Sequence, residues 1–309
     1  MIVVVLNPAA GRGVAQRAAP ALEGLLLGRG EEIAIRTTAA PGQACGLACT
    51  AALDGARVVA AAGGDGTVHD VANGLRQAAA QGASAALGVV PLGSGNDFAR
   101  AVGLPSGLEE ACERLFAHTT RRVDLGRVTR LAGDNVLDIQ STGHEFFANS
   151  LGAGFTASVV VETLALHRLT GVPLYMTALL RAVGLRYRTA GANITVDGQR
   201  SSMPVTTVDV MNGQWEGGGF WMAPSAQPDD GRLELVSIKA ARRLPLLGLV
   251  SRILKGAHTD SPLVSITPAL TLDFEFDQQL AVHADGELLA RAASALSLEV
   301  VTSALAVVA

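Results

Sequence analysis

The sequence predicts a two-domain α/β fold, with a Rossmann-like parallel sheet in the first domain and an antiparallel β-sandwich in the second. Two features predict it. Up to about residue 122, apolar strands alternate with helical segments, and from residue 123 onward short strands are separated by turn residues. The length of 309 residues agrees with two domains, because domains cluster near ~100–150 residues.

The first third of the chain alternates between strands and helices. Residues 2–6 are a continuous apolar run of strand length, and residues 15–27 carry apolar side chains at helical spacing. Further strands are expected at 32–37, 58–62 and 87–90, and further helices at 44–53 and 68–80. Because helices of this length form the crossovers between parallel strands, one parallel sheet covered on both faces is predicted.

The rest of the chain has shorter strands and more turns, a pattern typical of an antiparallel sandwich. Two helices interrupt it, at 157–169 and 246–255. The expected strands are 123–129, 145–151, 194–196, 205–211, 233–238, 271–276, 280–284 and 296–301.

Composition excludes several classes of protein. The formal net charge of −4 gives no basic footprint, so nucleic acid is not an expected partner. The three cysteines, Cys45, Cys49 and Cys112, cannot all pair, which suits a reducing cytoplasm. The only lysines are Lys239 and Lys255, so Gly-Lys-Ser/Thr does not occur and a P-loop NTPase is excluded.

The two ends of the sequence predict no targeting segment. A signal peptide would require basic residues before its apolar region, and none precedes the apolar run 2–6. The apolar C-terminal segment is interrupted by Glu299 and is shorter than a membrane span. We therefore expect a cytoplasmic protein that can lie at the inner face of the membrane.

Three glycine-containing loops follow predicted strands. Glycine lets the backbone approach a ligand closely, and amide groups at a helix N-terminus favour an anion such as phosphate. Because parallel strands end at one edge of their sheet, the loops are expected to form a single nucleotide site. Asp65 adds a carboxylate to this site. A negative charge beside phosphates is favourable only if a metal ion or a hydroxyl group interacts with it. The loops are Asn7-Pro8-Ala9-Ala10-Gly11-Arg12-Gly13, Gly63-Gly64-Asp65-Gly66-Thr67 and Gly93-Ser94-Gly95-Asn96-Asp97.

With four later segments, these loops resemble the diacylglycerol kinase catalytic-domain family, which includes bacterial lipid kinases and the sphingosine kinases. The Gly-Gly-Asp-Gly-Thr loop alone is shared with NAD kinases, whereas the whole series, in family order, spans nearly all of the chain. The later segments are Asn149-Ser150-Leu151-Gly152-Ala153-Gly154-Phe155, Ala223-Pro224-Ser225-Ala226-Gln227-Pro228-Asp229-Asp230-Gly231, Gly256-Ala257-His258 and Asp285-Gly286-Glu287.

The resemblance implies an ATP-dependent lipid kinase that phosphorylates a hydroxyl group of a lipid such as diacylglycerol, with ATP and Mg²⁺ in the cleft. It implies a nucleotide-binding domain at 1–125, rejoined by 288–309, and a lipid-binding sandwich at 126–287. The implied partners are the lipid substrate and, transiently, a membrane surface. A homodimer is compatible with the sequence, and the lipid itself is not identified.

The resemblance also implies roles for individual residues. Glu287 would be the general base, and Asp65 a second catalytic residue. Magnesium would be held by the Asp230 carboxylate and by backbone carbonyl groups of Gln227 and Arg232. Nucleotide contacts are implied for Asn7, Pro8, Ala9, Ala10, Gly11, Thr38, Gly64, Asp65, Gly66, Thr67, Val68, His69, Asp70, Ser94, Asn96 and Asp97.

Two positions depart from the family pattern. His69-Asp70 stands where the family usually has Asn-Glu, which bears on nucleotide preference, and Gly93-Ser94 replaces a Gly-Thr pair but keeps the hydroxyl. Since no Walker lysine exists, backbone amides, the metal ion and Arg12 or Arg100 are the candidates to offset phosphate charge.

Other interpretations stay open. One is an NAD-kinase-like enzyme acting on a small molecule, and another is a non-catalytic lipid- or nucleotide-binding regulator. Cys45 and Cys49 favour core packing over a metal site, and His283 is interpreted as a strand residue. A basic set in the second domain is compatible with a membrane surface or with a solvated face: Arg168, Arg181, Arg186, Arg188, Arg242, Arg243, Arg252 and Lys255.

Overall fold

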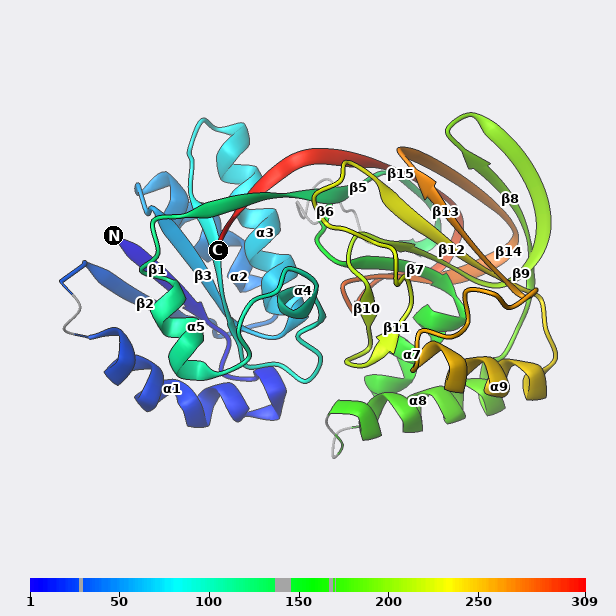
Figure 1. Cartoon of the computed structure of the whole chain (residues 1–309), viewed down its shortest axis with the longest axis horizontal. Helices are drawn as coiled ribbons and strands as arrows, with labels where there is room; N and C mark the ends of the chain where they lie inside the picture. Colours follow the sequence, from blue (N-terminus) through cyan, green and yellow to red (C-terminus); the bar gives the residue numbers. More distant parts are fainter. Residues whose placement is uncertain (28–29, 137–145, 167–168, 170) are drawn as a thin grey trace.

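The computed structural model describes residues 1–27, 30–136, 146–166, 169 and 171–309. It contains two halves that lie side by side (Figure 1). Helices surround a sheet in the first half, whereas strands dominate the second. The mixed α/β architecture in two parts agrees with the sequence prediction.

Four parallel strands form the centre of the first half: β1 (Ile2–Leu6), β2 (Ile33–Thr37), β3 (Val58–Gly63) and β4 (Ala86–Pro91). Their order is β2-β1-β3-β4, and every neighbouring pair is parallel. Successive side chains of β1 are fully buried, which explains why this strand is apolar throughout. The carboxyl ends of β1, β3 and β4 therefore meet at one edge, where the three glycine loops begin.

Helices cover both faces of this sheet. They are α1 (Val14–Leu26), α2 (Gln43–Leu53), α3 (Asp65–Ala80), α4 (Asp97–Ala101) and α5 (Leu108–Arg114), with a 3₁₀ turn η1 (Ala10–Arg12). On one face, α1 and α5 pack with Ile2 and Val4. On the other, α2 and α3 pack with Val3 and Val5. The short helices α4 and α5 were not predicted.

The second half is antiparallel in every strand pair that the structure describes. Its core contains large buried side chains from several strands, including Phe147, Ile194, Phe274 and Leu296. The strands are β5 (Thr120–Val136), β6 (Phe146–Phe147), β7 (Ser150–Gly154), β8 (Ala190–Val196), β9 (Gln199–Met211), β10 (Trp215–Glu216), β11 (Phe220–Trp221), β12 (Leu233–Lys239), β13 (Val264–Ala269), β14 (Thr271–Ala284) and β15 (Glu287–Val308).

A two-stranded ribbon of β5 and β15 connects the halves and runs along the top of both in Figure 1. Near its end, Val307 pairs in parallel with Leu87 of β4, so the last strand of the chain joins the first sheet. Because β5 and β15 extend through both halves, the domain boundaries at 125/126 and 287/288 stay predictions.

Several predicted strands are longer, or divided differently, in the structure, and β10, β11 and β13 were not predicted. The expected strands 271–276 and 280–284 are one strand, β14, whose pairing with β15 shifts register between Glu275 and Leu280. Residue 145 of the expected strand 145–151 lies outside the described residues, and the rest belongs to two strands, β6 and β7. The break occurs because the backbone amides of Ala148 and Asn149 donate to Asp285 instead of to a neighbouring strand. The expected strand 296–301 is part of the much longer β15.

Three helices lie along one side of the antiparallel strands: α7 (Phe155–Thr163), α8 (Gly171–Leu185) and α9 (Arg243–Ile253) (Figure 1). The expected helix 157–169 ends early, at Thr163, and its residues 167 and 168 lie outside the described part of the chain. The long helix α8 was not predicted. Among the helices described, none has the length and apolar character to cross a membrane.

Candidate active site at the junction of two cavities

A cleft of about 480 Å³ lies at the carboxyl edge of the parallel strands. All three glycine loops contribute to it, as does Glu287 at the start of β15. Twelve of the expected nucleotide contacts line it: Asn7, Pro8, Ala9, Ala10, Gly11, Thr38, Gly64, Gly66, Thr67, His69, Asp70 and Ser94. The wall also contains Ala39, Ala40, Pro41, Gly42, Ala44, Gly93, Leu288 and Leu289, which have no functional groups that could have identified them in the sequence.

The glycine loops contact one another directly. A Cβ atom on Gly93 would lie 2.2 Å from the Cα atom of Gly64, so a side chain at this position would collide with backbone. The amide of Asn7 donates a hydrogen bond of 3.1 Å to the Thr67 hydroxyl, which ties the first loop to the start of α3. The N-terminus of α3 therefore lies at the cleft, where its amide groups and dipole favour phosphate.

Two expected nucleotide residues make structural contacts outside the cleft wall. The Asn96 side chain accepts a hydrogen bond from the backbone amide of Gly93 (2.9 Å) and donates one to its carbonyl group (3.2 Å), which closes the third loop on itself. Val68 is buried in the core between α2 and α3. Neither residue lines the cleft. Arg12 and Arg100 do not line it either, and the Arg100 guanidinium lies 3.2 Å from the centre of the Trp215 ring.

Asp65 and Asp97 face a second cavity, on the other side of the glycine loops. Asp65 accepts a hydrogen bond from the Phe98 amide (3.1 Å), and Asp97 accepts one from the Gly218 amide (2.9 Å). Burial is the main reason that the pKa of Asp65 is raised to about 6 and that of Asp97 to about 8, and the Asp65 charge adds to the effect on Asp97. An acidic pair in which Asp97 is buried and Asp65 is half-buried favours a shared proton or a bound cation.

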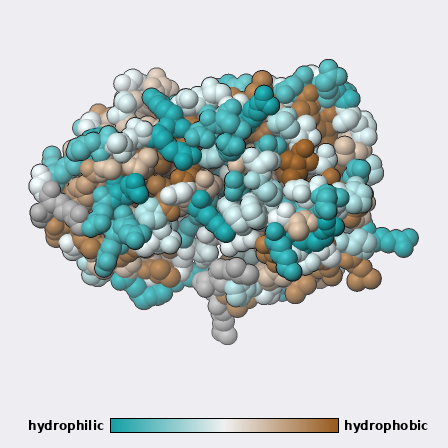
Figure 2. Space-filling model, in the orientation of Figure 1, coloured by the Kyte–Doolittle hydropathy of each residue, from teal (hydrophilic) through white to brown (hydrophobic). Residues whose placement is uncertain are grey.

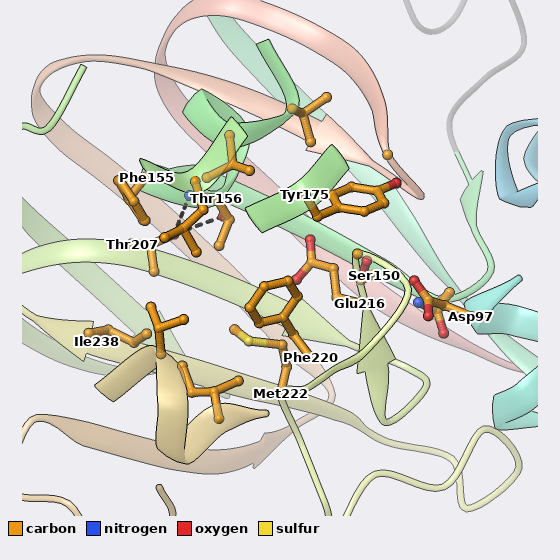
Figure 3. Close-up of a pocket in the computed structure, with 18 of the residues that line it drawn as sticks. Asp97, Ser150, Phe155, Thr156, Tyr175, Thr207, Glu216, Phe220, Met222 and Ile238 are labelled. Atoms are coloured by element: carbon orange, nitrogen blue, oxygen red, sulfur yellow. Dashed lines mark hydrogen bonds between the residues drawn. The ribbon is translucent and has the colours of Figure 1, made fainter. Parts of the chain in front are cut away.

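The second cavity is amphipathic along its length (Figure 3). Asp97 and Ser150 lie at one end, and Phe155 and Ile238 at the other. Burial also raises the pKa of Tyr175 at the polar end. The apolar end is formed by the three helices and two strands, through Phe155, Val159, Val160, Leu179, Phe220, Met222, Ile238, Leu246, Val250 and Ile253.

Glu287 lies beside the first turn of α3. A Cβ atom on Gly66 would be 2.2 Å from Glu287 Oε1, so glycine at position 66 makes room for this carboxylate. Glu287 lines the cleft, whereas Asp285 and Gly286, just before it, line the amphipathic cavity. The carboxylate that the resemblance assigned as general base thus lies at the border between the two cavities.

Asp285 holds this border in place. Its carboxylate accepts hydrogen bonds from the backbone amides of Ala148 (2.9 Å), Asn149 (2.8 Å) and Ser150 (3.0 Å). Its Oδ2 atom also lies 2.9 Å from Nδ1 of His69, which is buried on α3. The sequence marked His69 as a nucleotide contact and as a departure from the family pattern, but not as a partner of Asp285, which lies 216 residues further along the chain.

The proposed magnesium ligands lie apart from both cavities, in an exposed turn. Asp230 accepts a hydrogen bond of 3.0 Å from the Arg232 amide, and Gly231 donates one of 2.7 Å to buried Asp124. Asp124 also accepts from the Ser303 amide (2.7 Å), so it fixes this turn to β15. The donor set of two carbonyl groups and one carboxylate contains oxygen alone, which fits a hard cation such as Mg²⁺.

The basic set of the second half is partly committed to ion pairs. Arg181 and Arg186 both contact the buried carboxylate of Glu162, and Arg252 contacts Asp260. The Arg243 guanidinium lies 5.9 Å from the centre of the Tyr187 ring. Arg168 lies outside the described residues. Exposed basic side chains outside these ion pairs are Arg188, Arg242, Arg243 and Lys255.

Two family models match the chain in succession. The diacylglycerol kinase catalytic domain matches residues 1–128, and the YegS C-terminal NAD kinase beta sandwich-like domain matches residues 149–309. Their order is the order of the two halves in the structure.

Curated relatives match most of the chain. A protein of Chromohalobacter salexigens named "Probable lipid kinase YegS-like" is 33% identical over 84% of this chain and 78% of its own length. A protein of Mycobacterium tuberculosis named "Diacylglycerol kinase" is 30% identical over 93% of this chain and 88% of its own length.

Solved structures share the fold. One crystal structure of a Bacillus anthracis protein aligns with a TM-score of 0.79 and 22% identity, covering 99% of this chain and 94% of that chain. Another, described as a diacylglycerol kinase from the same organism, aligns with a TM-score of 0.74 and 21% identity, covering 99% and 96%. At these identities the likeness concerns the fold.

Proposed function

The chain belongs to the diacylglycerol kinase catalytic-domain family, and from this premise we propose that it is an ATP-dependent lipid kinase, which transfers the γ-phosphoryl group of ATP to a hydroxyl group of a lipid such as diacylglycerol. One observation carries the proposal. Asp65 lines the amphipathic cavity, while its neighbours Gly64 and Gly66 line the polar cleft. A phosphate in the cleft and a hydroxyl group in the cavity would therefore approach each other at this loop.

The chain's own groups divide the work of phosphoryl transfer. The glycine loops and the start of α3 would hold the phosphates, since positioning and charge neutralisation supply most of the catalysis in such reactions. Glu287, at the border, would accept the proton of the attacking hydroxyl group. Mg²⁺, when bound, would offset phosphate charge, and Asp230 with the carbonyl groups of Gln227 and Arg232 would hold a further, structural Mg²⁺.

The amphipathic cavity suits the lipid acceptor. Its apolar end would take an acyl chain, and its acidic end would take the hydroxyl group that is phosphorylated. Among the described residues that line it, none is basic, whereas four are acidic: Asp65, Asp97, Glu216 and Asp285. Because like charges repel strongly at low dielectric, this end disfavours an anionic headgroup and suits a neutral one, as in diacylglycerol.

The helices at the apolar end would bring the cavity to the membrane. Leu180 and Leu185 of α8 and Leu244 of α9 are 57%, 71% and 81% exposed. Figure 2 shows hydrophobic and hydrophilic surface mixed at the lower right, where α9 lies in Figure 1. Leu244 directly follows the exposed Arg242 and Arg243, and leucine beside arginine is the mixture that binds an anionic membrane surface.

Transfer of labelled phosphate from ATP tests the activity. Mixed micelles would carry diacylglycerol, a sphingoid base or phosphatidylglycerol, and NAD would be offered as a soluble acceptor. We expect a labelled product from diacylglycerol and none from NAD. Labelling of NAD alone would favour the NAD-kinase-like alternative, and binding of ATP without any transfer would favour a non-catalytic regulator.

Sedimentation with anionic vesicles tests the membrane surface separately. Leu244→Asp should reduce the vesicle-bound fraction, whereas Leu53→Asp, at a 47% exposed position on α2, should leave it unchanged. Equal binding of both variants would contradict the assignment of this surface.

A further inference from the structure

A second polar cluster begins in the wall of the amphipathic cavity, and the proposed phosphoryl transfer assigns it no catalytic step. It consists of Asp209 on β9, Glu216 on β10 and His283 on β14. One ligand atom from each side chain lies within 4.8 Å of the other two. Glu216 Oε1 and His283 Nε2 are 2.9 Å apart.

The strand register explains how these side chains meet. Gly152 of β7 is the direct partner of Asp209 on one side and of His283 on the other, so the three residues form a row across adjacent antiparallel strands. Residues paired in this way point to the same face of a sheet. A Cβ atom on Gly152 would lie 2.5 Å from Asp209 Oδ1 and 2.5 Å from His283 Nε2. Glycine in the middle of the row therefore leaves the space in which the two flanking side chains converge.

The cluster contains polar atoms without partners. Asp209 and His283 are 0% exposed. Asp209 Oδ1 accepts a hydrogen bond from Thr156 (2.5 Å), but its Oδ2 atom, Glu216 Oε2 and His283 Nδ1 have no hydrogen-bond partner among the described residues. The other ring nitrogen of His283, Nε2, has only the Glu216 carboxylate beside it. Buried polar atoms are nearly always satisfied in folded proteins, so this group indicates a missing ligand.

The charge balance points to a cation. Two carboxylates face each other in a buried site, and no lysine or arginine of the described chain forms an ion pair with either of them. Burial, followed by the Glu216 charge, raises the pKa of Asp209. Either a proton or a metal ion can relieve this repulsion. Ligand atoms around a metal at ~2.0–2.2 Å lie about 3–4 Å apart, and the cluster is close to that spacing.

We propose that Asp209, Glu216 and His283 bind a borderline divalent metal ion such as Zn²⁺ in the wall of the amphipathic cavity. One imidazole and two carboxylates suit Zn²⁺ or Mn²⁺ better than Mg²⁺, which prefers oxygen and water. Three protein ligands leave a fourth position open. Glu216 projects into the cavity (Figure 3), so that position faces the space proposed for the lipid headgroup.

Zinc binding by the full-length protein tests the site without reference to activity. After treatment with a chelator, the protein would be dialysed against Zn²⁺ and its metal content measured. We expect one tightly bound ion per chain. Asp209→Asn keeps the shape and the acceptor for Thr156, and His283→Gln removes the nitrogen ligand. Each should weaken binding by at least about tenfold, since even residues that only orient a ligand change affinity ~10–100-fold.

His118→Gln is the matched control, because His118 is exposed and far from the cluster in the first half. It should bind Zn²⁺ like the wild type. Thermal unfolding with and without Zn²⁺ guards against misfolded variants, since a bound ion raises the Tm of any variant that keeps the site. Anomalous diffraction at the zinc edge should show a peak between the three side chains.

Three results would overturn the proposal. They are a wild-type protein that retains no Zn²⁺, equal retention by wild type and His283→Gln, and an anomalous peak elsewhere, for example at Cys45 and Cys49. The first would mean that Asp209 and Glu216 share a proton. The last two would place the metal outside this cluster.

Discussion

The Nδ1 atom of His69 and the Oδ2 atom of Asp285 lie 2.9 Å apart in a fully buried contact. It joins α3, which carries the Gly-Gly-Asp-Gly-Thr loop, to the turn that carries Glu287. Asp285 has a φ of 48°, a conformation that is unfavourable for a residue other than glycine. The contact with His69 and the hydrogen bonds from three backbone amides compensate for this strain. His69 therefore serves to hold the Asp285 turn, and with it Glu287, in place.

His69→Ala should therefore lower both stability and activity. Removing one partner of a buried charged group costs about 1–3 kcal/mol, and the turn before Glu287 loses a restraint. Urea unfolding measures the first effect, and kcat for the lipid the second. His118→Ala, at an exposed histidine, should change neither. Equal stability of the two variants would show that the buried contact contributes little.

Asp97→Asn should make the ligand-free protein more stable at alkaline pH. The pKa of Asp97 is raised to about 8 in the folded protein, mainly by burial, against ~3.9 in an unfolded chain. The unfolded chain therefore releases this proton first, and the stability present below about pH 4 is lost as pH rises to about 8. Asparagine does not ionise, so this loss disappears.

We expect a gain of about 1–3 kcal/mol at pH 8.5 and a smaller one at pH 5, in urea unfolding without ATP or Mg²⁺. The metal must be absent because a bound cation lowers the pKa of a nearby carboxyl group. Asp273→Asn, at an exposed position of β14, should show no such pH dependence. A gain that is independent of pH would contradict the ionisation of Asp97 as its cause.

The elements that the sequence predicted well are those whose apolar pattern is set by burial on both faces. The strand 2–6 matches β1, and the helices α1, α2 and α3 lie within a few residues of prediction. Helix α8 was not predicted because it is apolar around most of its circumference and therefore shows little amphipathic periodicity. Gly171 and Pro173 at its start also hide the helix, since both residues are typical of turns. β14 was predicted as two strands instead of one because the polar residues Asp277 to Gln279 resemble a turn in the sequence.

The candidate site was predictable where the chemistry resides in glycine loops, since these have a local signature. The side-chain clusters that were not predicted are formed by residues that meet only through the pairing and packing of distant segments. His69 contacts Asp285, and Asp209 meets His283 across Gly152, each from segments far apart in the chain. No local pattern specifies such a pairing. The separation of Asp65 and Asp97 from the cleft also depends on how the second half packs against the loops.

Asp230→Ala should weaken activity through Mg²⁺ binding. The variant loses a carboxylate in an exposed turn, together with its hydrogen bond to the Arg232 amide, so stability should fall by only about 0.5–1.5 kcal/mol. Raising the Mg²⁺ concentration should partly restore kcat. Asp229→Ala is the matched control, since the neighbouring Asp229 pairs with Arg121 on the surface. If the two variants respond alike to Mg²⁺, the segment is a plain turn fixed by Asp124.

Glu287→Gln should remove most of the activity while leaving the fold and ATP binding intact. A lipid hydroxyl group is a weak nucleophile at neutral pH, and a positioned base is worth ~10²–10⁴ in rate. Among the carboxylates near the border, Asp285 is occupied by three backbone amides and His69. Burial raises the pKa of Asp97 to about 8, which favours its protonated form at neutral pH. Glu287 is exposed beside Gly66 at the edge of the cleft, where it could accept a proton and release it to solvent.

Glutamine keeps the size of Glu287 and its fit against Gly66, so the comparison isolates the proton acceptor. We expect kcat to fall by at least about 10²-fold, with KM for ATP and Tm nearly unchanged. Glu287→Asp should recover only part of the rate. It restores a carboxylate, but the shorter side chain places it one methylene further from the lipid hydroxyl group. Glu299→Gln is a surface control, since Glu299 pairs with Arg127 on the ribbon away from the cavities. Normal turnover by Glu287→Gln would exclude this residue as the base and shift the assignment to Asp65, the remaining carboxylate that reaches the junction of the two cavities.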